Sequence, residues 1–419
     1  MKIMAYRALQ NNRVSGRGPG MQGLLQRGFS LVELMIAVAL GLLIMVALIA
    51  VFLNVNRTNA EMSKTNGLIE NGRFAIDLLQ EDLSHAGYWG GYVPDFDDLS
   101  VTVVPGSTPT SSPNPCLAYS IANWTAEHKN NLIGIPVQSY TGVPTGCASA
   151  FFPSQKADSD VLVVRHADTC VAGVGACPAE DPGELMFQPS RCTAQVSAGV
   201  PYVLSNTGFD RTQMDCATTA ELRKYMSNIF YIRDYAVDVG DGVPTLMRSS
   251  FDVASGTPLQ KTAEPLIEGI EGLVVLWGVD AKSRCNTDVD YSTATVIPPV
   301  PASSSAVQRV DPSTASTTCS VDVDNASKNT LPPNRGDGVP ESYVHCSGSG
   351  GCTVGQLRDA VSAKVYVLAR SKDRTPGYTD DKTYALGTVS LGPFNDGYKR
   401  HVFQTTVRLG NVSGRRGTP

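Results

Sequence analysis

A single carboxylate, Glu33, lies at the start of a long apolar stretch, Leu34 to Leu53. Two kinds of chemistry fit this position. Ser30 and Glu33 have the S-x-x-E spacing of a capping box, in which each side chain binds a free amide of the first helical turn. A carboxylate at the edge of an apolar span is also costly unless it finds a cationic partner. The sequence leaves both roles open for Glu33, and they can operate at different stages.

Ten cysteines, all beyond residue 115, form the second set of chemically informative residues. An even number of cysteines after one N-terminal apolar segment predicts disulfides in an oxidising compartment. The sequence alone does not fix their connectivity, but short loops close at lower entropic cost, which favours neighbours. The favoured pairs are Cys116–Cys147, Cys170–Cys177, Cys192–Cys216, Cys285–Cys319 and Cys346–Cys352.

Catalytic and metal-binding motifs are missing from the sequence. It contains no C-x-x-C, H-E-x-x-H, G-x-S-x-G or P-loop pattern. The histidines are dispersed: His85, His128, His166, His345 and His401. An acidic loop region lacks the spacing of an EF-hand, so a solvated loop is favoured over a calcium site there; its residues are Asp322, Asp324, Asn325 and Asp337. We therefore expect no catalytic residues, no metal and no cofactor, and a protein that is not an enzyme.

Composition narrows the class of protein further. The chain has 419 residues, of which 42% are hydrophobic, so it can bury a sizeable core. Its formal net charge of −5 argues against nucleic-acid binding as the main function. The first 28 residues are the exception, because they are basic and contain no Asp or Glu. Such a segment keeps the N-terminus in the cytoplasm.

The uncharged stretch Leu34–Leu53 has the length of a membrane span. Its 20 residues would extend ~30 Å as a helix, about one bilayer core. It is longer than the apolar region of an ordinary cleaved signal peptide, ~7–15 residues, and no A-x-A site follows it. We expect a single pass through the inner membrane, with the rest of the chain outside the cytoplasm.

The segment Gly28-Phe29-Ser30-Leu31-Val32-Glu33 resembles the type III signal of prepilins and pseudopilins. The resemblance implies that a prepilin peptidase cleaves between Gly28 and Phe29, removes the leader 1–28 and methylates the new N-terminal Phe29. It also implies that Glu33 pairs with the N-terminal amine of a neighbouring subunit during assembly. Met21 offers a second start, with a leader of eight residues.

The residues after the span predict one continuous helix, from Ser30 to about Ala86. Val55, Met62, Ile69, Ile76 and Leu83 recur every seven residues, and no proline occurs from Phe29 to Tyr92. The stripe fits either an independent coiled coil or, as we favour, packing on a sheet of the same chain. Gly87 to Pro94 should end the helix.

A β-rich head, residues 87–419, is expected to follow. Predicted strands are Asp160–Ala167, Asn228–Tyr235, Thr245–Phe251, Leu273–Val279, Ala363–Ala369 and His401–Leu409. Helical patterns do not alternate with them, so we expect an antiparallel sheet. Residues 99–155 are expected to be loops, and a Ser/Thr/Pro-rich insertion at about 281–334 to be disordered. The fold class is therefore α+β, with a long N-terminal helix, membrane-spanning in its first half, packed on the sheet.

Three head segments resemble the PilW family of minor type IV pilins: Pro265–Asp280, Val365–Ser371 and Tyr398–Asn411. The resemblance implies a pilin-like fold and a role in type IV pilus assembly, in the priming or tip complex, supporting pilus biogenesis, twitching motility and adhesion. The alternatives are a minor pseudopilin of a type II secretion system or, less favoured, a membrane-anchored periplasmic enzyme. The implied partners are the prepilin peptidase, other minor pilins, the major pilin, a tip adhesin and the bacterial inner membrane. The implied final location is the extracellular pilus.

Overall fold

A computed structural model describes residues 28–99, 101, 103–254, 256–283, 286–294 and 334–416. The chain divides into two units, residues 1–60 and 61–419. Helix α1 (Leu31–His85) begins in the first unit and ends in the second. Its observed bounds agree with the helix predicted from Ser30 to about Ala86. In the first unit its apolar side chains are exposed, and the helix is long and apolar enough to cross a membrane.

Within the second unit, one face of α1 is buried. The buried residues follow the 3.6-residue period of a straight helix, so they line a single side; they are Leu68, Gly72, Ala75, Ile76, Leu79 and Leu83. The sequence had placed Met62 on the buried stripe, but it is 57% exposed and this prediction is wrong. A strict seven-residue repeat drifts around a straight helix, and only two helices that coil together keep it in contact. Here the helix lies on sheets instead.

Two features end α1 where the sequence predicted. Gly87 adopts φ +74°, a conformation that residues with a side chain rarely take, and its amide donates to the Arg165 carbonyl at 3.0 Å. The side-chain amide of Asn411 donates to the carbonyls of Ser84, His85 and Ala86 at 3.2–3.3 Å. These carbonyls have no partner inside the helix, so Asn411 caps the helix end from far along the chain.

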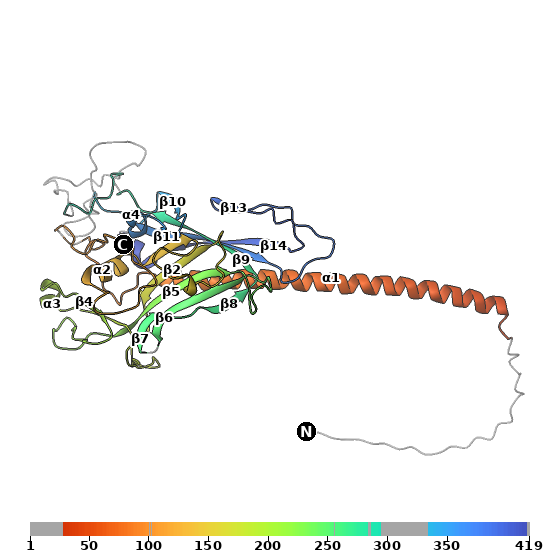
Figure 1. The fold of residues 1–419 in the computed structure, drawn as a ribbon, viewed down its shortest axis with the longest axis horizontal. Coiled ribbons are helices and arrows are strands. Elements are labelled where there is room, and N and C mark those ends of the chain that lie inside the picture. The colour runs from red at the N-terminus through yellow and green to blue at the C-terminus, as the bar shows by residue number, and fades with distance from the viewer. Residues whose placement is uncertain are drawn as a thin grey trace, which may run out of the picture. The chain divides into compact units, whose positions relative to one another are not determined.

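The described residues of the head form two antiparallel sheets and a separate hairpin. The larger sheet has the order β1-β2-β5-β3-β4, with β6 paired to β5 and both β7 and β8 paired to β6. Its strands are β1 (Val137–Thr141), β2 (Asp160–Ala167), β3 (Met186–Pro189), β4 (Tyr202–Ser205), β5 (Arg223–Arg233), β6 (Thr245–Ala254), β7 (Thr257–Gln260) and β8 (Glu264–Glu268). The head strands are seen in Figure 1.

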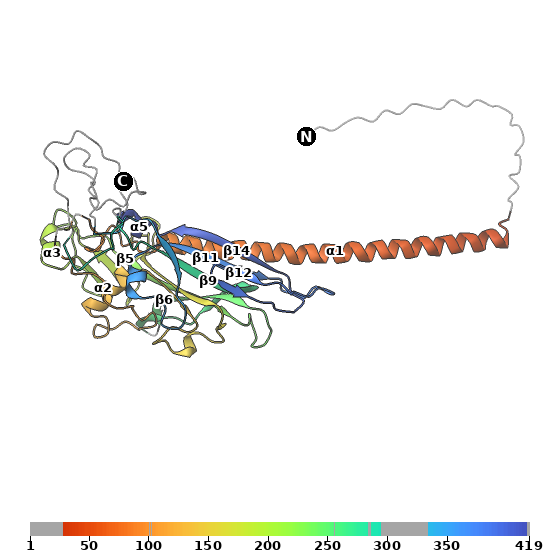
Figure 2. The same cartoon turned by 90° about the horizontal axis from the view of Figure 1, so that it is seen from above.

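The smaller sheet has the order β10-β9-β11-β14. Its strands are β9 (Ile270–Val279), β10 (Ser342–His345), β11 (Ala360–Arg370) and β14 (Arg400–Arg408). In register, Val365 lies between Val275 on one side and Thr405 on the other. The hairpin of β12 (Tyr384–Leu386) and β13 (Val389–Leu391) belongs to the connection from β11 to β14 (Figure 2). Short helices complete the described head: α2 (Ala126–Gly134), η1 (Ser149–Phe151), α3 (Thr193–Ser197), α4 (Val354–Arg358) and α5 (Gly410–Arg416).

The main core lies between α1 and one face of each sheet. Leu79 and Leu83 of the helix pack in one cluster with alternate residues of β2, β5, β9 and β11. The opposite face of the smaller sheet packs on the hairpin, where Leu276 and Leu386 share a second cluster. The predicted α+β class, with a long helix packed on antiparallel sheet, is therefore confirmed.

Helix and sheet approach most closely at Gly72. A Cβ atom added there would lie 2.1 Å from Cε2 of Phe403 on β14, a distance that real side chains do not reach. The small residue thus sets the depth to which α1 sits on the smaller sheet.

Strand prediction succeeded for all six strands proposed, and β2 has the predicted bounds. The expectation of loops throughout 99–155 is wrong, because α2, β1 and η1 lie there. The sequence of β1, VQSYT, is too polar to predict a buried strand. Tertiary partners make it one: Gln138 donates to Ser112 Oγ at 2.7 Å, and Ser139 accepts from the Trp277 indole at 2.8 Å.

The insertion expected to be disordered begins as ordered chain. Tyr291 is 7% exposed, and its hydroxyl donates to Asp359 at 2.9 Å. Residues 286–294 are therefore part of the folded head, anchored by one aromatic side chain. The remainder of the insertion up to residue 333 lies outside the described residues.

Candidate functional site

The N-terminal signal residues adopt the capping-box geometry. The Ser30 amide donates to Glu33 Oε2 at 2.9 Å, and the Glu33 amide donates to Ser30 Oγ at 3.2 Å. Both residues are exposed, and Phe29 is 87% exposed. Within the described part of the chain Glu33 forms no ion pair. Its carboxylate thus serves the helix start while its charge stays unmatched.

The described surroundings of Gly28 give no structural reason for a glycine at this position. A Cβ atom built there meets nothing within 4 Å, and the residue does not adopt a positive φ. A requirement for glycine at residue 28 would therefore come from another molecule that binds the Gly28–Phe29 bond.

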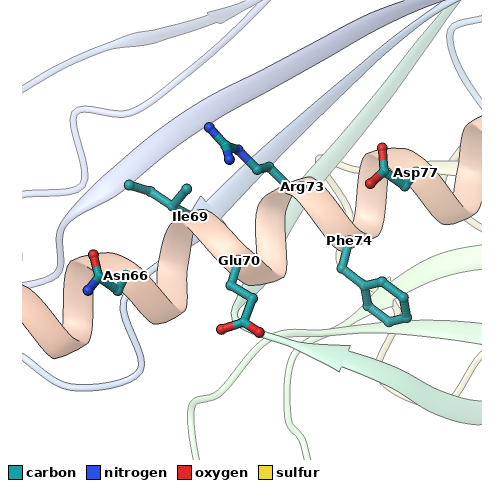
Figure 3. Close-up of a pocket in the computed structure, with 6 residues that line it drawn as sticks. All are labelled: Asn66, Ile69, Glu70, Arg73, Phe74 and Asp77. Carbon is teal, nitrogen blue, oxygen red and sulfur yellow. The ribbon is translucent and has the colours of Figure 1, made fainter.

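A second feature, the outer helix face, lies on the side of α1 away from the buried stripe. It is a shallow hollow lined by Asn66, Ile69, Glu70, Arg73, Phe74 and Asp77 (Figure 3). Phe74 is 56% exposed. Arg73 forms no ion pair with a described residue of the chain, although Glu70 and Asp77 lie one turn away on either side. An exposed aromatic ring among unpaired charges suits contact with another chain. Sequence reasoning missed this face, and its only signal was an aromatic residue off the heptad stripe.

Glu61 fastens the start of the head's helix to the connection between β11 and β14. Its carboxylate contacts Lys399 Nζ at 2.8 Å and Thr375 Oγ1 at 2.7 Å. Lys64 Nζ lies 3.1 Å from the same carboxylate and donates to the Arg374 carbonyl at 2.9 Å. The hydrogen bond from Lys399 is the largest cause that lowers the pKa of Glu61 to about 2.

Arg400 is the centre of a buried ion cluster on β14, which we call the Arg400 cluster. The guanidinium is fully buried and binds three carboxylates: Glu271, Asp380 at 2.8 Å and Asp396 at 2.7 Å. Burial opposes ionisation of Glu271, but the hydrogen bond from Arg400 and the charges of Lys156 and Arg370 lower its pKa overall. Tyr384 also donates to Asp380, at 3.0 Å. The cluster therefore ties the hairpin segment to the smaller sheet, a role the sequence did not reveal.

A second buried cluster joins α5 to the rest of the head. Arg416 contacts Asp97 at 2.8 Å, Asp359 at 3.2 Å and Asp280 at 3.5 Å. Burial raises the pKa of Asp280 to about 6, although Arg416 opposes this shift. Together with Asn411, this cluster anchors α5 beside the end of α1.

A histidine–carboxylate pair, with a buried Asp160 and a partly buried His345, joins the two sheets. His345 Nε2 on β10 lies 3.0 Å from Asp160 Oδ2 on β2, and Asp160 also accepts from the Val275 amide at 2.9 Å. The hydrogen bond to Asp160 raises the pKa of His345. The protonated imidazolium is thus the form that holds the two sheets together.

The His345 pair predicts a pH-dependent contribution to stability. Because its pKa is higher in the folded protein, the contribution is complete below about pH 6.5, the ordinary histidine pKa, and is lost as pH rises through the folded value. His345→Gln should lower the free energy of unfolding by about 1 kcal/mol at pH 6 and by less at pH 8.5. Denaturant unfolding in EDTA at both values measures this. His401→Gln, an exposed histidine on β14, is the matched control; equal losses at both pH values for His345→Gln would contradict the prediction.

The cysteines pair as neighbours in the described structure. Disulfides join Cys116 to Cys147, Cys170 to Cys177, Cys192 to Cys216 and Cys346 to Cys352. The fifth expected pair, Cys285–Cys319, lies outside the described residues. Thr141 and Thr145 donate backbone hydrogen bonds to the Cys346–Cys352 loop at 3.1 and 2.9 Å, so this loop staples β10 to the end of β1.

The acidic loop region is described only at Asp337. Its carboxylate lies with those of Asp280 and Glu341, with ligand atoms within 4.8 Å of one another. Asp280 is already held by Arg416 and accepts from the Gly338 amide at 2.9 Å, so this group carries no metal assignment. Asp322, Asp324 and Asn325 lie outside the described residues.

Two protein families match the sequence. The prokaryotic N-terminal methylation motif matches residues 24–49, and the family described as Type IV Pilus-assembly protein W matches residues 229–312 and 317–411. Among solved structures, a type IV-like pilin from Thermus thermophilus is similar, at 11% identity and a TM-score of 0.23, over 62% of this chain and 82% of that chain. No curated protein sequence matches significantly.

A methylation motif at the start of one long helix, which then packs on an antiparallel head, defines a pilin-type protein. The chain is a PilW-like minor pilin with a prepilin-type signal, and it acts in type IV pilus assembly. Both families point to a structural protein rather than an enzyme. They imply interaction with the pilus machinery and its peptidase, with membrane anchoring before entry into the pilus.

Gly28→Ala should block maturation. The peptidase must bring its own groups close to the Gly28–Phe29 bond, and a methyl group at residue 28 would obstruct that approach. Because no described residue contacts that position, the variant should fold and insert normally. Mass spectrometry should find N-methyl-Phe29 at the start of the wild-type protein and residues 1–28 still attached in the variant. Normal cleavage of Gly28→Ala would contradict this prediction.

Proposed function

We propose that this minor pilin acts at the initiation of the pilus, in a priming or tip complex, rather than as a repeated subunit of the shaft. The match to the pilus-assembly family over residues 229–312 and 317–411 supports the role in building the pilus, and the unmatched charge of Glu33 behind the Gly28–Phe29 junction supports contact between subunits. Among the described residues of its own chain this carboxylate has no cation, and the amine of a cleaved Phe29 would lack an anion. Two such subunits satisfy one another when the amine of one meets the carboxylate of the next.

The outer helix face supplies a second contact in this proposal. Phe74 offers apolar surface, while Glu70, Arg73 and Asp77 offer charges of both signs. A helix of another pilin with complementary charges would bury the Phe74 ring and pair Arg73. The partners proposed are other minor pilins and the major pilin, with the prepilin peptidase acting earlier and a tip adhesin bound at the head.

The proposed route runs from cytoplasmic leader to extracellular tip. The N-terminus lies in the cytoplasm, residues 34–53 span the inner membrane once, and the head folds in the periplasm before assembly. Five disulfides, including Cys285–Cys319, stabilise the head in these oxidising compartments. Pilus biogenesis, twitching motility and adhesion depend on the protein through this one assembly step.

A deletion strain complemented in trans tests the proposal. Loss of the protein should abolish or sharply reduce pili counted by electron microscopy, and the wild-type gene should restore them. Immunogold labelling of the restored pili should mark ends rather than the shaft. Uniform labelling along the shaft, or normal pili in the deletion strain, would contradict an initiating role. Normal pili with a loss of protein secretion would instead favour a type II secretion pseudopilin.

A further inference from the structure

We propose that β14 receives an extended strand of a different pilus subunit, a strand with apolar side chains on one face and a carboxylate on the other. β14 forms one edge of the smaller sheet (Figure 2). Among the described strands only β11 pairs with it, so its outward amides and carbonyls have no ladder partner there. The proposal rests on the pilin class of the protein and not on an initiating role, so it would stand even if that role were disproved.

β14 lacks the features that usually protect a free edge. Free edges are normally short, bulged, or interrupted by lysine or proline. This strand has nine residues, and its register with β11 runs from Arg400 to Arg408 without a shift. Residues 402–407 contain no charged side chain and no proline. A long, flat and uncharged edge pairs readily with a further strand, as in β-augmentation.

The face of β14 toward α1 is incompletely covered. Phe403 lies against Gly72 of the helix, and Thr405 Oγ1 donates to Gln80 Oε1 at 2.9 Å. Both strand residues remain partly exposed, whereas Val367, which lies opposite Phe403 on β11, is fully buried. The edge residue lacks a neighbour on its outer side. A strand beside β14 with apolar side chains on this face would cover Phe403.

The opposite face indicates the charge of the partner strand. Arg408 is exposed, and Lys364 on β11 lies opposite Thr406 on this face. Arg408 Nε donates to the Ser413 hydroxyl at 2.7 Å, and Lys364 Nζ lies 3.7 Å from the centroid of the Tyr343 ring. Neither cation has a carboxylate partner among the described residues. A carboxylate on the added strand would complement both charges.

Photo-crosslinking in cells that make pili tests the proposal. The full-length protein with p-benzoylphenylalanine in place of the exposed Thr406 should form an adduct on irradiation. Mass spectrometry should place the crosslink in an extended segment of a different pilus subunit, and this segment should contain Asp or Glu. The same probe at Ile121, which is 80% exposed before α2, is the matched control and should not reach that segment.

Charge reversal tests the predicted carboxylate. Arg408→Glu should lower the yield of the Thr406 adduct at least about tenfold, whereas Arg408→Lys should retain the adduct. Lys261→Glu, which reverses an exposed charge between β7 and β8 of the larger sheet, should leave the yield unchanged. Circular dichroism verifies that each variant is folded. An unchanged yield in Arg408→Glu would overturn the acidic partner.

Proline separates strand pairing from side-chain contact. Successive amides of a strand point to opposite sides, so one of Gln404 and Thr405 donates toward β11 and the other points outward. Proline at the outward position should leave the sheet folded and abolish the adduct. A folded proline variant at either position that still forms the adduct in full yield would overturn strand pairing. Absence of an adduct, or an adduct with a helix, with the same chain or with a second copy of it, would also overturn the proposal.

Discussion

Glu33→Gln should reduce recovery of the protein in sheared pili by a factor of hundreds or more, while membrane insertion and leader cleavage proceed normally. Glutamine keeps the acceptor oxygen that the Ser30 amide uses, so the capping box survives. What it removes is the charge. In the membrane before assembly, water and lipid headgroups solvate the carboxylate and the Phe29 amine. In a filament that solvation is lost, and each group needs the other.

The size of the effect separates the two roles of Glu33. Breaking a buried ion pair costs about 3–5 kcal/mol, and each 1.4 kcal/mol is a factor of ten in an equilibrium constant. Loss of a helix cap alone costs about 0.5–2 kcal/mol and falls on the monomer. Ser30→Ala, which removes the cap but keeps the charge, is therefore the matched control and should assemble nearly as wild type does.

Quantitative immunoblots of sheared filaments against whole cells measure both variants. Asp77→Asn adds a control for loss of a carboxylate elsewhere on α1. Normal recovery of Glu33→Gln in filaments would show that its charge is dispensable and leave the capping box as the role of Glu33. A stronger defect in Ser30→Ala than in Glu33→Gln would lead to the same conclusion.

Arg400→Gln should lower the free energy of unfolding of the head by about 3–5 kcal/mol. The substitution leaves the fully buried Asp380 without an ion-pair partner among the described residues, and it leaves Glu271, whose side chain is 6% exposed, with Lys156 and the more distant Arg370. Buried carboxylates without a partner either remain charged at high cost or take up protons. The loss should therefore shrink as pH falls from 7 toward 5, because protonation neutralises the orphaned carboxylates. Over the same range the wild-type head should keep the contribution of Glu271, because pairing lowers the pKa of this group and the contribution is lost only as pH falls below its ordinary value of 4.5.

Denaturant unfolding of the full protein at pH 7 and pH 5 measures the change. Hydrogen exchange should locate the loosened segment at residues 371–399, which the Arg400 cluster holds to the smaller sheet. Lys372→Gln is the matched control: its ion pair with Glu268 is exposed, so its loss should cost no more than about 1 kcal/mol. A loss below 1 kcal/mol for Arg400→Gln would mean that the hairpin is held by apolar packing alone.

Local sequence signals predicted the helix and the principal strands. The repeat period and the proline-free length were enough to predict α1, and alternation was enough to predict β14. Proximity along the chain also predicted the disulfide partners found in the described residues. The motif residues Gly28, Phe29 and Glu33 were identifiable for the same reason, because they are adjacent in sequence.

Features that depend on contacts between residues far apart in the sequence were not predictable from it. β1 is buried only because Trp277 and Ser112 satisfy its polar side chains. The start of the buried stripe at Leu68 depends on where the sheets reach the helix, so the heptad pattern placed Met62 wrongly. The partners of Arg400 are 4, 20 and 129 residues away along the chain. No local sequence pattern predicts such a cluster.

The cap that Asn411 places on the end of α1 has a consequence for the order of events during synthesis. Ser84 and Asn411 are 327 residues apart, so the carbonyls at the helix end wait for a segment that is synthesised long after them. Until residues 410–416 are in place, β11 also lacks α5 beside it. A chain that is clipped before this segment would thus keep α1 but expose the end of the helix. Protease sensitivity near residues 84–86 should therefore distinguish truncated chains from complete ones.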